Sequence, residues 1–400
     1  MTWRRVPPVY SPVGARALMD GVRAAIGAAP DLRTMVESSL RHRYGSADVI
    51  LTDGGTSALL LALQNALPKG ATVALPSYCC IDVTAAAVAA GVGVRLYDVD
   101  PVTLSPNPDS VRAAISRGVQ AIVVAHLYGY PADVRAVQSL AAEHGILVIE
   151  DAAQAAGGSV NGSLLGSIGD IAVLSFGRGK GTTAGSGGAL LIKSSRLSDF
   201  ANRARSVTRN GTRGAMQLAG VAAQAVLAHP WLYALPASVP ALRLGEMVYH
   251  PAHSPRRISR VGAAVLNRTL ASAEADVAAR RARAASLLSE IESIASVVTV
   301  RTISGGNSGY LRLAVLDSAG VREARPDLGV LRGYPLTLDQ HSQLEPLLHP
   351  GERAGSGSVY LRERLFTIPT HPRTTQSHSR DVVDWLRTAR IAPHVAPAFS

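Results

Sequence analysis

Short apolar runs alternate with helical stretches between residues 50 and 195 of this 400-residue chain. Parallel strands need a long crossover connection, so this alternation is the pattern of repeated β–α–β units. It predicts an α/β fold in which helices sandwich a mostly parallel sheet. The expected strands are 72–75, 94–97, 121–125, 147–149, 171–175 and 189–192, and the expected helices are 57–66, 82–90, 109–116 and 132–144.

The regular alternation stops near residue 200, and 400 residues exceed the roughly 250–300 that one core usually serves. We expect two domains. Residues 1–250 would hold an N-terminal segment and the large α/β domain. Residues 251–400 would hold an Arg/Ala-rich linker helix at about 270–294 and a smaller C-terminal α+β domain, closed by a helix near 379–388. Glycine-rich segments at 305–307 and 351–357 are expected to be surface loops.

One long apolar stretch, 214–242, carries no charged residue. Three prolines, Pro230, Pro236 and Pro240, interrupt it, and its longest unbroken part is too short to cross a bilayer. No membrane span is therefore expected. A buried helix, or an apolar lid over a site, is the favoured interpretation.

The composition limits the partners. The formal charge is 40 − 29 = +11, but no Lys/Arg run or aromatic-basic pattern marks a nucleic-acid surface. An anionic small molecule fits this charge at least as well. Only two cysteines occur, the adjacent Cys79 and Cys80, so no disulfide framework is expected and a reducing compartment is favoured. The N-terminus lacks the apolar run of an export signal, so we expect a cytoplasmic protein.

Several expected strands end in polar residues, and the carboxyl ends of parallel strands are where open α/β sheets bind ligands. In Ile149-Glu150-Asp151 an apolar strand ends in two acids. A carboxylate at Asp151 would pair with a protonated pyridine nitrogen, which makes pyridoxal phosphate (PLP) an electron sink. The alternative is an aspartate that caps the next helix.

A glycine-rich turn carries the most informative lysine. The segment Ser175-Phe176-Gly177-Arg178-Gly179-Lys180 follows a strand, and Ser175 is placed to reach a cofactor phosphate. Only Lys69, Lys180 and Lys193 occur in the chain, because arginine supplies nearly all the basic residues. Arginine cannot form an imine, so a lysine kept at this rim suggests covalent chemistry. The alternative is a solvated loop lysine.

A third segment, Gly54-Gly55-Thr56-Ser57, opens an apolar helix. Free N–H groups at a helix N-terminus bind phosphate, although an ordinary helix cap has the same residues. A magnesium-binding P-loop is excluded, because Gly181 follows Lys180 where serine or threonine is required. No metal site is expected.

Taken in order, these segments resemble the PLP-dependent sugar aminotransferases of fold type I, the DegT/StrS family. The resemblance is dense over about residues 50–210 and thin elsewhere. The matching motifs are Gly-Thr-x-Ala-Leu at 55–59, Pro-Ser at 76–77, Asp-x-Asp-Pro at 98–101, His-x-Tyr-Gly-x-Pro-Ala-Asp at 126–133, Glu-Asp-Ala-Ala-Gln at 150–154, Ser-Phe-x-x-x-Lys at 175–180 and Gly-Gly at 187–188.

The resemblance implies a role for each matching residue. Lys180 would carry PLP as a Schiff base and act as acid and base, and Asp151 would pair with the pyridine nitrogen. Gln154 would bond the phenolic oxygen of the cofactor. Its phosphate would lie at the helix opening that begins at Gly55, bound by Thr56, Ser57 and Ser175. The family implies a glutamate or glutamine donor, a keto-sugar nucleotide acceptor and a homodimer with shared active sites.

Three departures from the family concern binding. The aromatic residue that stacks on the cofactor ring falls on Cys80, a plain buried thiol in the simplest interpretation, and Tyr78 is a possible substitute. The cross-subunit asparagine is missing from 255–258, where Arg256 or Arg257 would have to serve, although a surface arginine is the default. Arg178 would clamp a substrate carboxylate or phosphate, or be an exposed loop residue.

The apolar stretch at 214–242 is a fourth departure, and it leaves open whether the acceptor is a nucleotide sugar. Two rival functions also stay open: a PLP-dependent dehydratase or cyclase acting on a sugar or natural-product intermediate, and a non-catalytic sensor that keeps the fold. Sugar dehydratases of this group carry histidine in place of the lysine, so Lys180 favours transamination. Both Lys180 and Asp151 are present, which disfavours the sensor.

Overall fold

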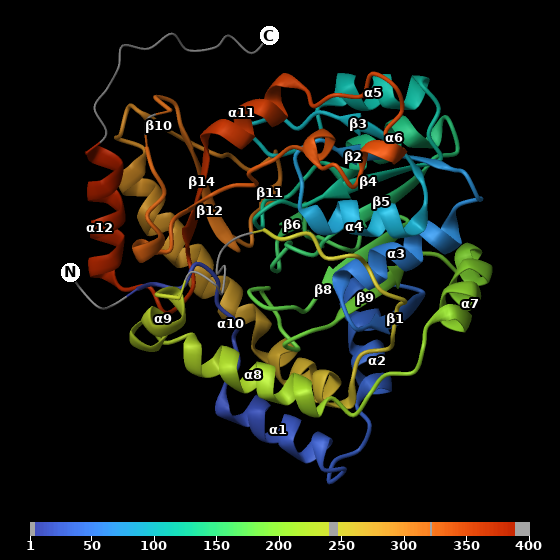
Figure 1. The fold of residues 1–400 in the computed structure, drawn as a ribbon, viewed down its shortest axis with the longest axis horizontal. Coiled ribbons are helices and arrows are strands. Elements are labelled where there is room, and N and C mark those ends of the chain that lie inside the picture. Colours follow the sequence, from blue (N-terminus) through green and yellow to red (C-terminus); the bar gives the residue numbers. More distant parts are fainter. Residues whose placement is uncertain (1–4, 240–246, 321, 389–400) are drawn as a thin grey trace.

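The computed structural model describes residues 5–239, 247–320 and 322–388. Its main sheet has seven strands in the order β1-β9-β8-β5-β4-β2-β3 (Figure 1). β9 lies antiparallel between β1 and β8, and the pairings from β8 to β3 are parallel. The strands are β1 (Asp48–Thr52), β2 (Thr72–Pro76), β3 (Gly93–Tyr97), β4 (Ala121–Ala125), β5 (Leu147–Asp151), β8 (Ile171–Ser175) and β9 (Gly188–Ile192).

Helices cover both faces of this sheet, as the sequence predicts for strands that are apolar throughout. In β4, Val123 belongs to the cluster under α3 and α4, whereas Ile122 and Val124 belong to the cluster on the opposite face. The helices of this part are α1 (Ala15–Ala25), α2 (Arg33–Tyr44), α3 (Gly55–Ala66), α4 (Ile81–Ala90), α5 (Pro108–Ser116), α6 (Val134–Ala142) and α7 (Ser198–Val207).

The predicted fold class is confirmed, and all six predicted strands and four predicted helices are present within a few residues of their expected bounds. Strand β1 and helices α1 and α2 were not predicted. Helix ends are harder to predict than helix centres, as α6 illustrates. This helix begins after Asp133, whose carboxylate accepts a hydrogen bond from the Ala136 N–H. Such a cap fixes the first turn and excludes the residue before it from the helix.

The C-terminal part has its own antiparallel sheet, in the order β10-β12-β14-β13. Its elements are β10 (Val297–Thr299), β12 (Arg312–Asp317), β13 (Leu331–Arg332), α11 (Ser356–Arg364), β14 (Leu365–Pro369) and α12 (Gln376–Arg387). A small third sheet joins β11 (Gly306–Asn307) to β6 (Ser159–Val160) and β7 (Ser163–Leu164). Short 3-10 turns lie at Ser195–Leu197, Pro326–Leu328, Leu338–Gln340 and Glu345–Leu347.

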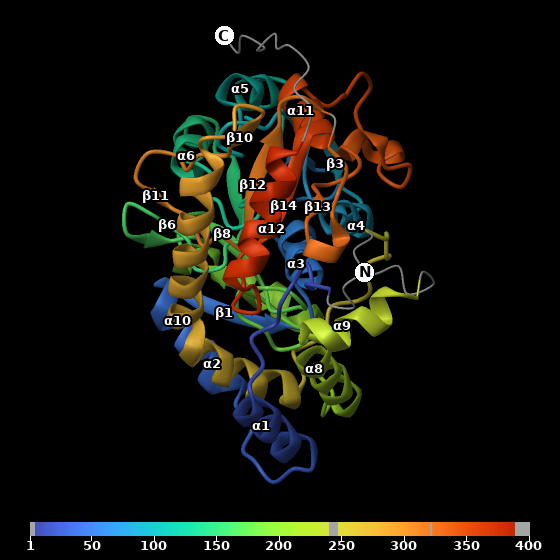
Figure 2. The same cartoon turned by 90° about the vertical axis from the view of Figure 1, so that its left-hand side faces the viewer.

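Helix α10 (Arg260–Ile291) is the predicted linker and begins ten residues earlier than expected. Its 32 residues make it about 48 Å long. It contacts α1, α2 and α8, which come earlier in the chain, and also β10 and α12 of the C-terminal part. It therefore runs along both parts of the molecule (Figure 2). The division into two domains near residue 250 remains our proposal.

The prediction of a buried helix in the apolar stretch is wrong. Helix α8 (Ala215–Leu227) has one buried residue, Val221, and α9 (Pro230–Ala237) follows it after a bend of 113°. Residues 240–242 of the stretch lie outside the described part. No single helix of the described residues is long and apolar enough to cross a membrane, and α8 with α9 meets that criterion only as a bent pair.

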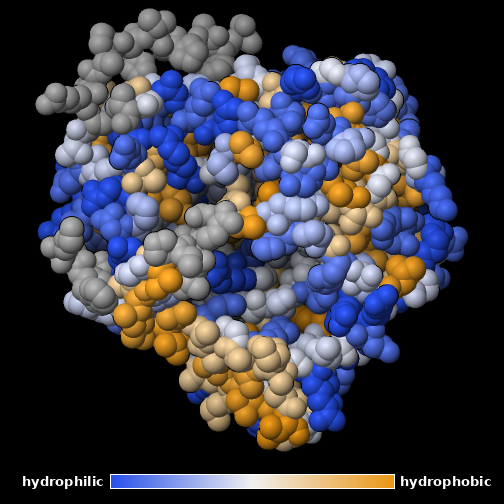
Figure 3. All heavy atoms as spheres, viewed as in Figure 1, coloured by the Kyte–Doolittle hydropathy of each residue, from blue (hydrophilic) through white to orange (hydrophobic). Residues whose placement is uncertain are grey.

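Exposed apolar side chains gather over α8, α9 and α1 on the face drawn in Figure 3. The exposed large apolar residues of these helices are Met19, Val22, Met216, Val226, Trp231, Leu232 and Leu235. An amphipathic helix buries its apolar stripe against a core. Helix α8 instead leaves much of its apolar surface outside the core.

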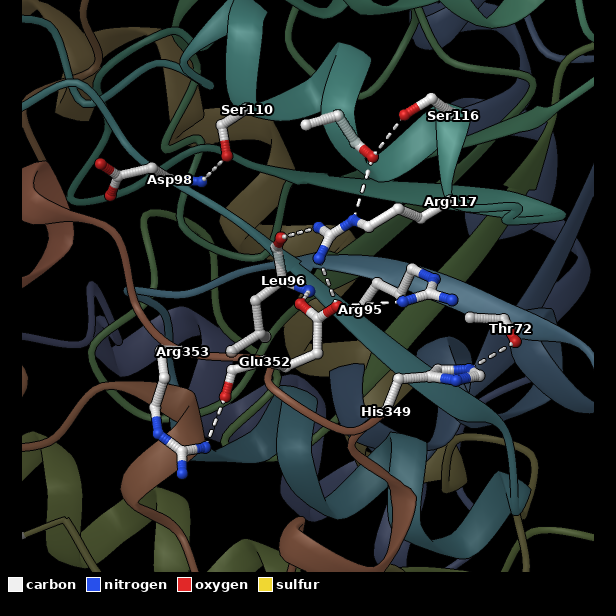
Figure 4. Close-up of polar contacts among 11 residues, drawn as sticks. Thr72, Arg95, Leu96, Asp98, Ser110, Ser116, Arg117, His349, Glu352 and Arg353 are labelled. Atoms are coloured by element: carbon white, nitrogen blue, oxygen red, sulfur yellow. Dashed lines mark hydrogen bonds and ion pairs between the residues drawn. The ribbon is translucent and has the colours of Figure 1, made fainter.

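The segment 351–357 is not simply a surface loop. Glu352 is 2% exposed and accepts hydrogen bonds from the Arg95 and Arg117 guanidinium groups, at 3.1 and 2.6 Å (Figure 4). Its second oxygen accepts from the Leu96 N–H at 2.8 Å. These bonds fix the segment against β3.

Candidate active site

One pocket lies at the carboxyl ends of the parallel strands, where the sequence predicts the chemistry. It collects residues from the ends of β4, β5 and β8, from the first turns of α3 and α4, and from the turn after β8. Its lining is Gly55, Thr56, Leu59, Cys79, Cys80, Asp82, Val83, Ala125, His126, Leu127, Asp151, Ala153, Gln154, Val173, Ser175, Lys180 and Tyr334.

The first turn of α3 forms one end of the pocket. Gly54 has extended backbone angles and no side chain caps the helix, so the first N–H groups of α3 have no acceptor among the described residues. Gly55 lets this turn approach β8, since a Cβ there would lie 2.8 Å from the Ser175 Cβ. The Thr56 and Ser175 hydroxyls line the same end. This is a site for a phosphate group.

Asp151 ends β5, and one of its carboxylate oxygens accepts a hydrogen bond from the Ala153 N–H at 3.0 Å. The other oxygen has no hydrogen-bond partner among the described residues. Burial raises the pKa of Asp151, while the Ala153 N–H and the charge of Lys180 act in the opposite direction. A partly buried carboxylate with an unpaired oxygen is suited to a cationic partner in the pocket.

Behind Asp151, Glu150 and His126 form a buried pair at 2.9 Å. Glu150 also accepts hydrogen bonds from the Gly166, Ile168 and Gly169 N–H groups. Burial raises the pKa of Glu150, but the bonds from His126 and the backbone outweigh it and hold that pKa below its usual value.

The tautomer of His126 follows from its two hydrogen bonds. Its Nδ1 accepts from the Ala132 N–H at 2.9 Å, so its proton is assigned to Nε2, which donates to Glu150. The ring is therefore fixed in one orientation where it lines the pocket. The wall beside Asp151 is rigid.

Lys180 comes from the turn Gly177–Lys180, closed by a hydrogen bond from the Lys180 N–H to the Gly177 carbonyl at 3.4 Å. Gly179 has a positive φ of 75°, which glycine tolerates best. The Lys180 amine has no hydrogen bond or ion pair with a described residue. It lines the same pocket as Asp151.

Gln154 lies between two fixed groups. Its Oε1 accepts from the Tyr128 N–H at 3.0 Å, and its Nε2 donates to the Tyr334 hydroxyl at 2.7 Å. The amide carries a second N–H, which is free to donate to an oxygen in the pocket. Tyr334 in turn stacks on Tyr128, with ring centroids 5.3 Å apart.

The two candidates for the ring-stacking position differ. Cys80 lines the pocket, and burial together with Asp82 raises the pKa of its thiol to about 12, so it stays neutral. Tyr78 is fully buried and lies outside the lining. Its hydroxyl accepts from the Tyr334 N–H at 2.9 Å. The structure thus favours Cys80 over Tyr78 for contact with a ring.

Three further candidates lie away from this pocket. Ser57 is buried in α3 and does not line it. Arg257 pairs with Glu37 at 3.0 Å, and Arg178 points to a different cavity. The Arg256 N–H and carbonyl bond to Asp53, just before α3.

Sequence reasoning did not assign three polar pocket residues. Asp82 is in the first turn of α4, two positions after Cys80, and His126 belongs to a quoted family motif at the end of β4. His126 was detectable as a polar residue just after an apolar strand, and Asp82 as an acid in the first turn of an apolar helix. Tyr334 lies 180 residues from its partner Gln154 and carried no local signal.

The fold and the pocket together define the class of protein. An amine on a rim lysine, a partly buried carboxylate with an unpaired oxygen and a helix N-terminus open to phosphate match the parts of PLP: its aldehyde carbon, its pyridine nitrogen and its phosphate. The residues therefore fit this cofactor. The fold and the pocket are those of the PLP-binding proteins of fold type I.

The chain belongs to the DegT/DnrJ/EryC1/StrS aminotransferase family, whose sequence profile matches residues 31–328. This confirms the family resemblance. The dTDP-4-dehydro-2,3,6-trideoxy-D-glucose 4-aminotransferase of Saccharopolyspora spinosa is 35% identical over 189 residues, which are 46% of this chain and 48% of that protein. An L-glutamine:2-deoxy-scyllo-inosose aminotransferase of Streptomyces lividus is 30% identical over 262 residues, 65% of this chain and 56% of that protein.

The matches therefore span about half the length of these curated relatives. Among solved structures, an aminotransferase of Streptoalloteichus hindustanus superposes with a TM-score of 0.76 at 24% identity, covering 96% of this chain and 98% of that one. At this identity the likeness establishes the fold.

Proposed function

We propose that the protein is a PLP-dependent aminotransferase that moves the amino group of glutamate or glutamine to a keto-sugar in amino-sugar or secondary-metabolite biosynthesis. In this proposal the keto-sugar is nucleotide-linked, like the dTDP-linked sugar in the name of the Saccharopolyspora spinosa relative. The observation that carries the proposal is that Lys180 and Asp151 line one pocket whose end is the open first turn of α3. The named activities of the relatives from Saccharopolyspora spinosa and Streptomyces lividus support the acceptor and donor classes.

In this proposal, each residue at the rim has a binding task. The N–H groups of the first turn of α3, that of Ser57 among them, would hold the phosphate together with the Thr56 and Ser175 hydroxyls. Asp151 holds the pyridine nitrogen in its protonated state. The second N–H of Gln154 donates to the phenolic oxygen, and the neutral Cys80 thiol packs on the ring.

Bound PLP supplies an electron sink for the carbanion that forms when a C–H bond of the donor breaks. Lys180 would hold PLP through its Nζ, and the free Nζ would take the proton from the α-carbon of the donor. The donor would take up the oxygen of a water molecule and leave as a 2-oxo acid. In the second half of the reaction Nζ would return a proton to the acceptor carbon, where an amine replaces the ketone oxygen, which leaves as water.

The first test compares wild type with Lys180→Ala, using Lys193→Ala as a matched control because Lys193 is an exposed lysine near the same sheet. Borohydride reduction should fix PLP to the peptide that contains Lys180, as read by mass spectrometry. Lys180→Ala should lose the visible band of lysine-bound PLP, whereas Lys193→Ala should keep it. An adduct on Lys69 or Lys193 instead would refute the assignment.

Adding L-glutamate or L-glutamine to the wild type should then bleach that visible band and release the matching 2-oxo acid in a one-to-one ratio. A dehydratase would show no such donor-dependent release. Loss of the band without 2-oxo acid would therefore exclude transamination while leaving PLP binding intact.

We also propose a cytoplasmic homodimer with shared active sites, as the family resemblance implies. Both Cys79 and Cys80 are free thiols, which suits a reducing compartment. The exposed apolar side chains of α1 and of the residue that follows it suit burial against another copy; they are Met19, Val22 and Ile26. Sedimentation equilibrium measures the mass of the assembly directly.

A further inference from the structure

Helix α8 has the reverse of the usual pattern of a surface helix, which turns its polar side chains to water and its apolar ones to the core. Its only polar side chains are Gln217 and Gln224, and both bond to the protein. Gln217 donates to the Ala184 and Ser186 carbonyls, both at 2.7 Å. Gln224 donates to the Gly185 carbonyl at 3.4 Å. The polar side of this helix therefore faces inward.

The outward side of α8 is apolar, and so is that of α9. None of the exposed residues of α8 has a polar side chain. Its exposed stripe runs through residues three and four positions apart, namely Met216, Ala219, Ala223 and Val226. Met216 is 87% exposed. In α9 the large exposed residues are Trp231, Leu232 and Leu235. We call these seven residues the α8–α9 face, and Figure 3 shows apolar side chains over both helices on one side of the molecule.

The shape of the pair suits the surface of a bilayer. The helices have 13 and 8 residues and meet at a bend of 113°, whereas a helix that crosses a bilayer needs about 20 residues. Short apolar helices instead lie in the plane of the surface, with their apolar side at the boundary between headgroups and acyl chains. Trp231 is 55% exposed, and tryptophan is enriched at that boundary.

Positive charge lies at both ends of the α8–α9 face. Arg213 directly precedes α8, is exposed, and its side chain has no hydrogen bond or ion pair with a described residue. At the other end, Arg5 donates to a carbonyl of α9 at 2.8 Å. Burial raises the pKa of Tyr233 in α9, and the opposing charges are all those of arginines, Arg178 and Arg5 among them. The sequence has no aspartate or glutamate from residue 206 to residue 239.

This charge distribution decides between two occupants of the face. In a two-fold dimer a patch meets its own copy, so a second copy would bring these arginines together with no carboxylate of the segment to pair with them. An anionic lipid surface instead offers a phosphate to each arginine and acyl chains to the apolar stripes. The exposed apolar residues of α1 belong to a neighbouring helix and stay available to the copy proposed above.

We propose that the α8–α9 face docks on the surface of a bilayer that contains anionic lipids. The apolar stripes enter the boundary below the headgroups, and Arg213, Arg5 and Arg178 contact the phosphates around them. The proposal goes beyond transamination and leaves its keto-sugar acceptor unchanged, because the face contributes no residue to the cofactor pocket.

The test is flotation of the full chain, loaded with PLP, with two kinds of vesicle in about 0.1 M NaCl. One kind is phosphatidylcholine alone, and the other contains about 30% phosphatidylglycerol. The anionic vesicles should bind the protein at least about tenfold more tightly, and the binding should weaken as NaCl rises to about 0.5 M. Equal binding to both vesicles, or none to the anionic ones, overturns the proposal.

Two substitutions locate the docking surface. Leu235→Glu should weaken binding to the anionic vesicles at least about tenfold, because binding scales with the apolar area that enters the bilayer. Met35→Glu is its matched control, since Met35 on α2 is equally 55% exposed and lies outside the face. Arg213→Gln should weaken binding about fivefold. Arg196→Gln, at an exposed position between β9 and α7, should leave it unchanged.

Tryptophan fluorescence measures the depth of insertion. Lipids that carry bromine on their acyl chains should quench the fluorescence of the wild type. Trp231→Phe removes one of the three tryptophans and should remove most of this quenching. Undiminished quenching in that variant would place the contact elsewhere and reject the α8–α9 face.

Sedimentation equilibrium separates the bilayer from a second copy. Leu235→Glu should have the same mass in solution as the wild type, and it should keep the visible band of bound PLP because Leu235 lies outside the cofactor pocket. A lower mass would assign the face to a second copy and overturn the proposal. Vesicle binding by a wild type that shows no PLP band would reject the proposed enzyme and leave the docking surface standing.

Discussion

At the scale of single residues, the carboxylate of Asp151 lowers the stability of the cofactor-free protein at neutral pH. Burial raises its pKa, so the folded state binds the proton more tightly than the unfolded chain does. The stability it contributes is full below the unfolded pKa near 3.8 and falls as the pH rises through the raised folded pKa. At neutral pH the empty site therefore carries a cost that a cationic ring nitrogen would remove.

Asp151→Asn should accordingly raise the melting temperature of the cofactor-free protein at neutral pH. The difference should shrink as the pH falls toward 3.8, because the wild-type acid then takes up its proton. The same variant should lose transamination by about a hundredfold or more, since the amide cannot hold the ring nitrogen protonated. Scanning calorimetry across pH, with and without PLP, measures both effects.

Asp109→Asn is the control, because that side chain is 91% exposed. It should change neither the melting temperature nor the activity. If Asp151→Asn destabilises the cofactor-free protein at neutral pH, the carboxylate has a cationic partner in the empty pocket, and the assignment above is wrong.

At the scale of elements, one buried carboxylate, that of Glu352, makes three of the hydrogen bonds that hold the segment before α11 (Figure 4). In Glu352→Gln one oxygen becomes an NH₂ group, which must then face either the Leu96 N–H or the two arginines. Arg117 is 42% exposed and can turn to water, which limits the loss. We expect a loss of roughly 2–4 kcal/mol in the free energy of unfolding.

Hydrogen exchange should show this loss as faster exchange in residues 349–355 and β3, with urea denaturation giving the size of the change. Glu345→Gln is the matched control: Glu345 is exposed and has no ion pair with a described residue. It should change stability by no more than about 0.5 kcal/mol. Equal effects of the two substitutions would show that the buried bonds of Glu352 contribute nothing.

The same scale shows what the sequence predicted and what it missed. The strands β2, β3, β4, β5, β8 and β9 were predictable because each is a short apolar run bounded by turns, and the rim position of Asp151 and Lys180 followed from them. The exposed face of α8 was not predictable, because an apolar stretch has the same sequence pattern whether it packs against the core or stays exposed. Tyr334 reaches Gln154 only through the C-terminal part, a contact with no local pattern.

At the scale of the whole molecule, the extended N-terminal segment at residues 6–7 makes hydrogen bonds to the C-terminal part. Pro7 accepts a hydrogen bond from the His371 ring at 2.8 Å, and Val6 donates to the Asp327 carbonyl. Burial lowers the pKa of His371 to about 4 from 6.5. The folded state thus excludes the proton that the unfolded chain accepts below pH 6.5, and the stability present above 6.5 is lost as the pH falls toward 4.

At pH 5 this loss amounts to about 2 kcal/mol, at roughly 1.4 kcal/mol for each pH unit below 6.5. Limited proteolysis should therefore cut the wild type near residues 5–11 faster at pH 5 than at pH 7.5. His371→Gln should remove most of this pH dependence, because glutamine can donate to Pro7 without titrating. His144→Gln, at an exposed position, should leave the pH dependence unchanged.

The bond between Pro7 and His371 also sets an order of assembly during synthesis. The two residues are 364 positions apart, so at about 5–20 residues per second the ribosome makes His371 about 20–70 s after Pro7. The Lys180 turn can fold long before then, but the N-terminal segment whose Ser11 accepts a hydrogen bond from the Gly179 N–H must wait to be fixed at Pro7. The first residues to emerge are thus among the last to dock, and a nascent chain has its reactive lysine before the segment beside that lysine is fixed.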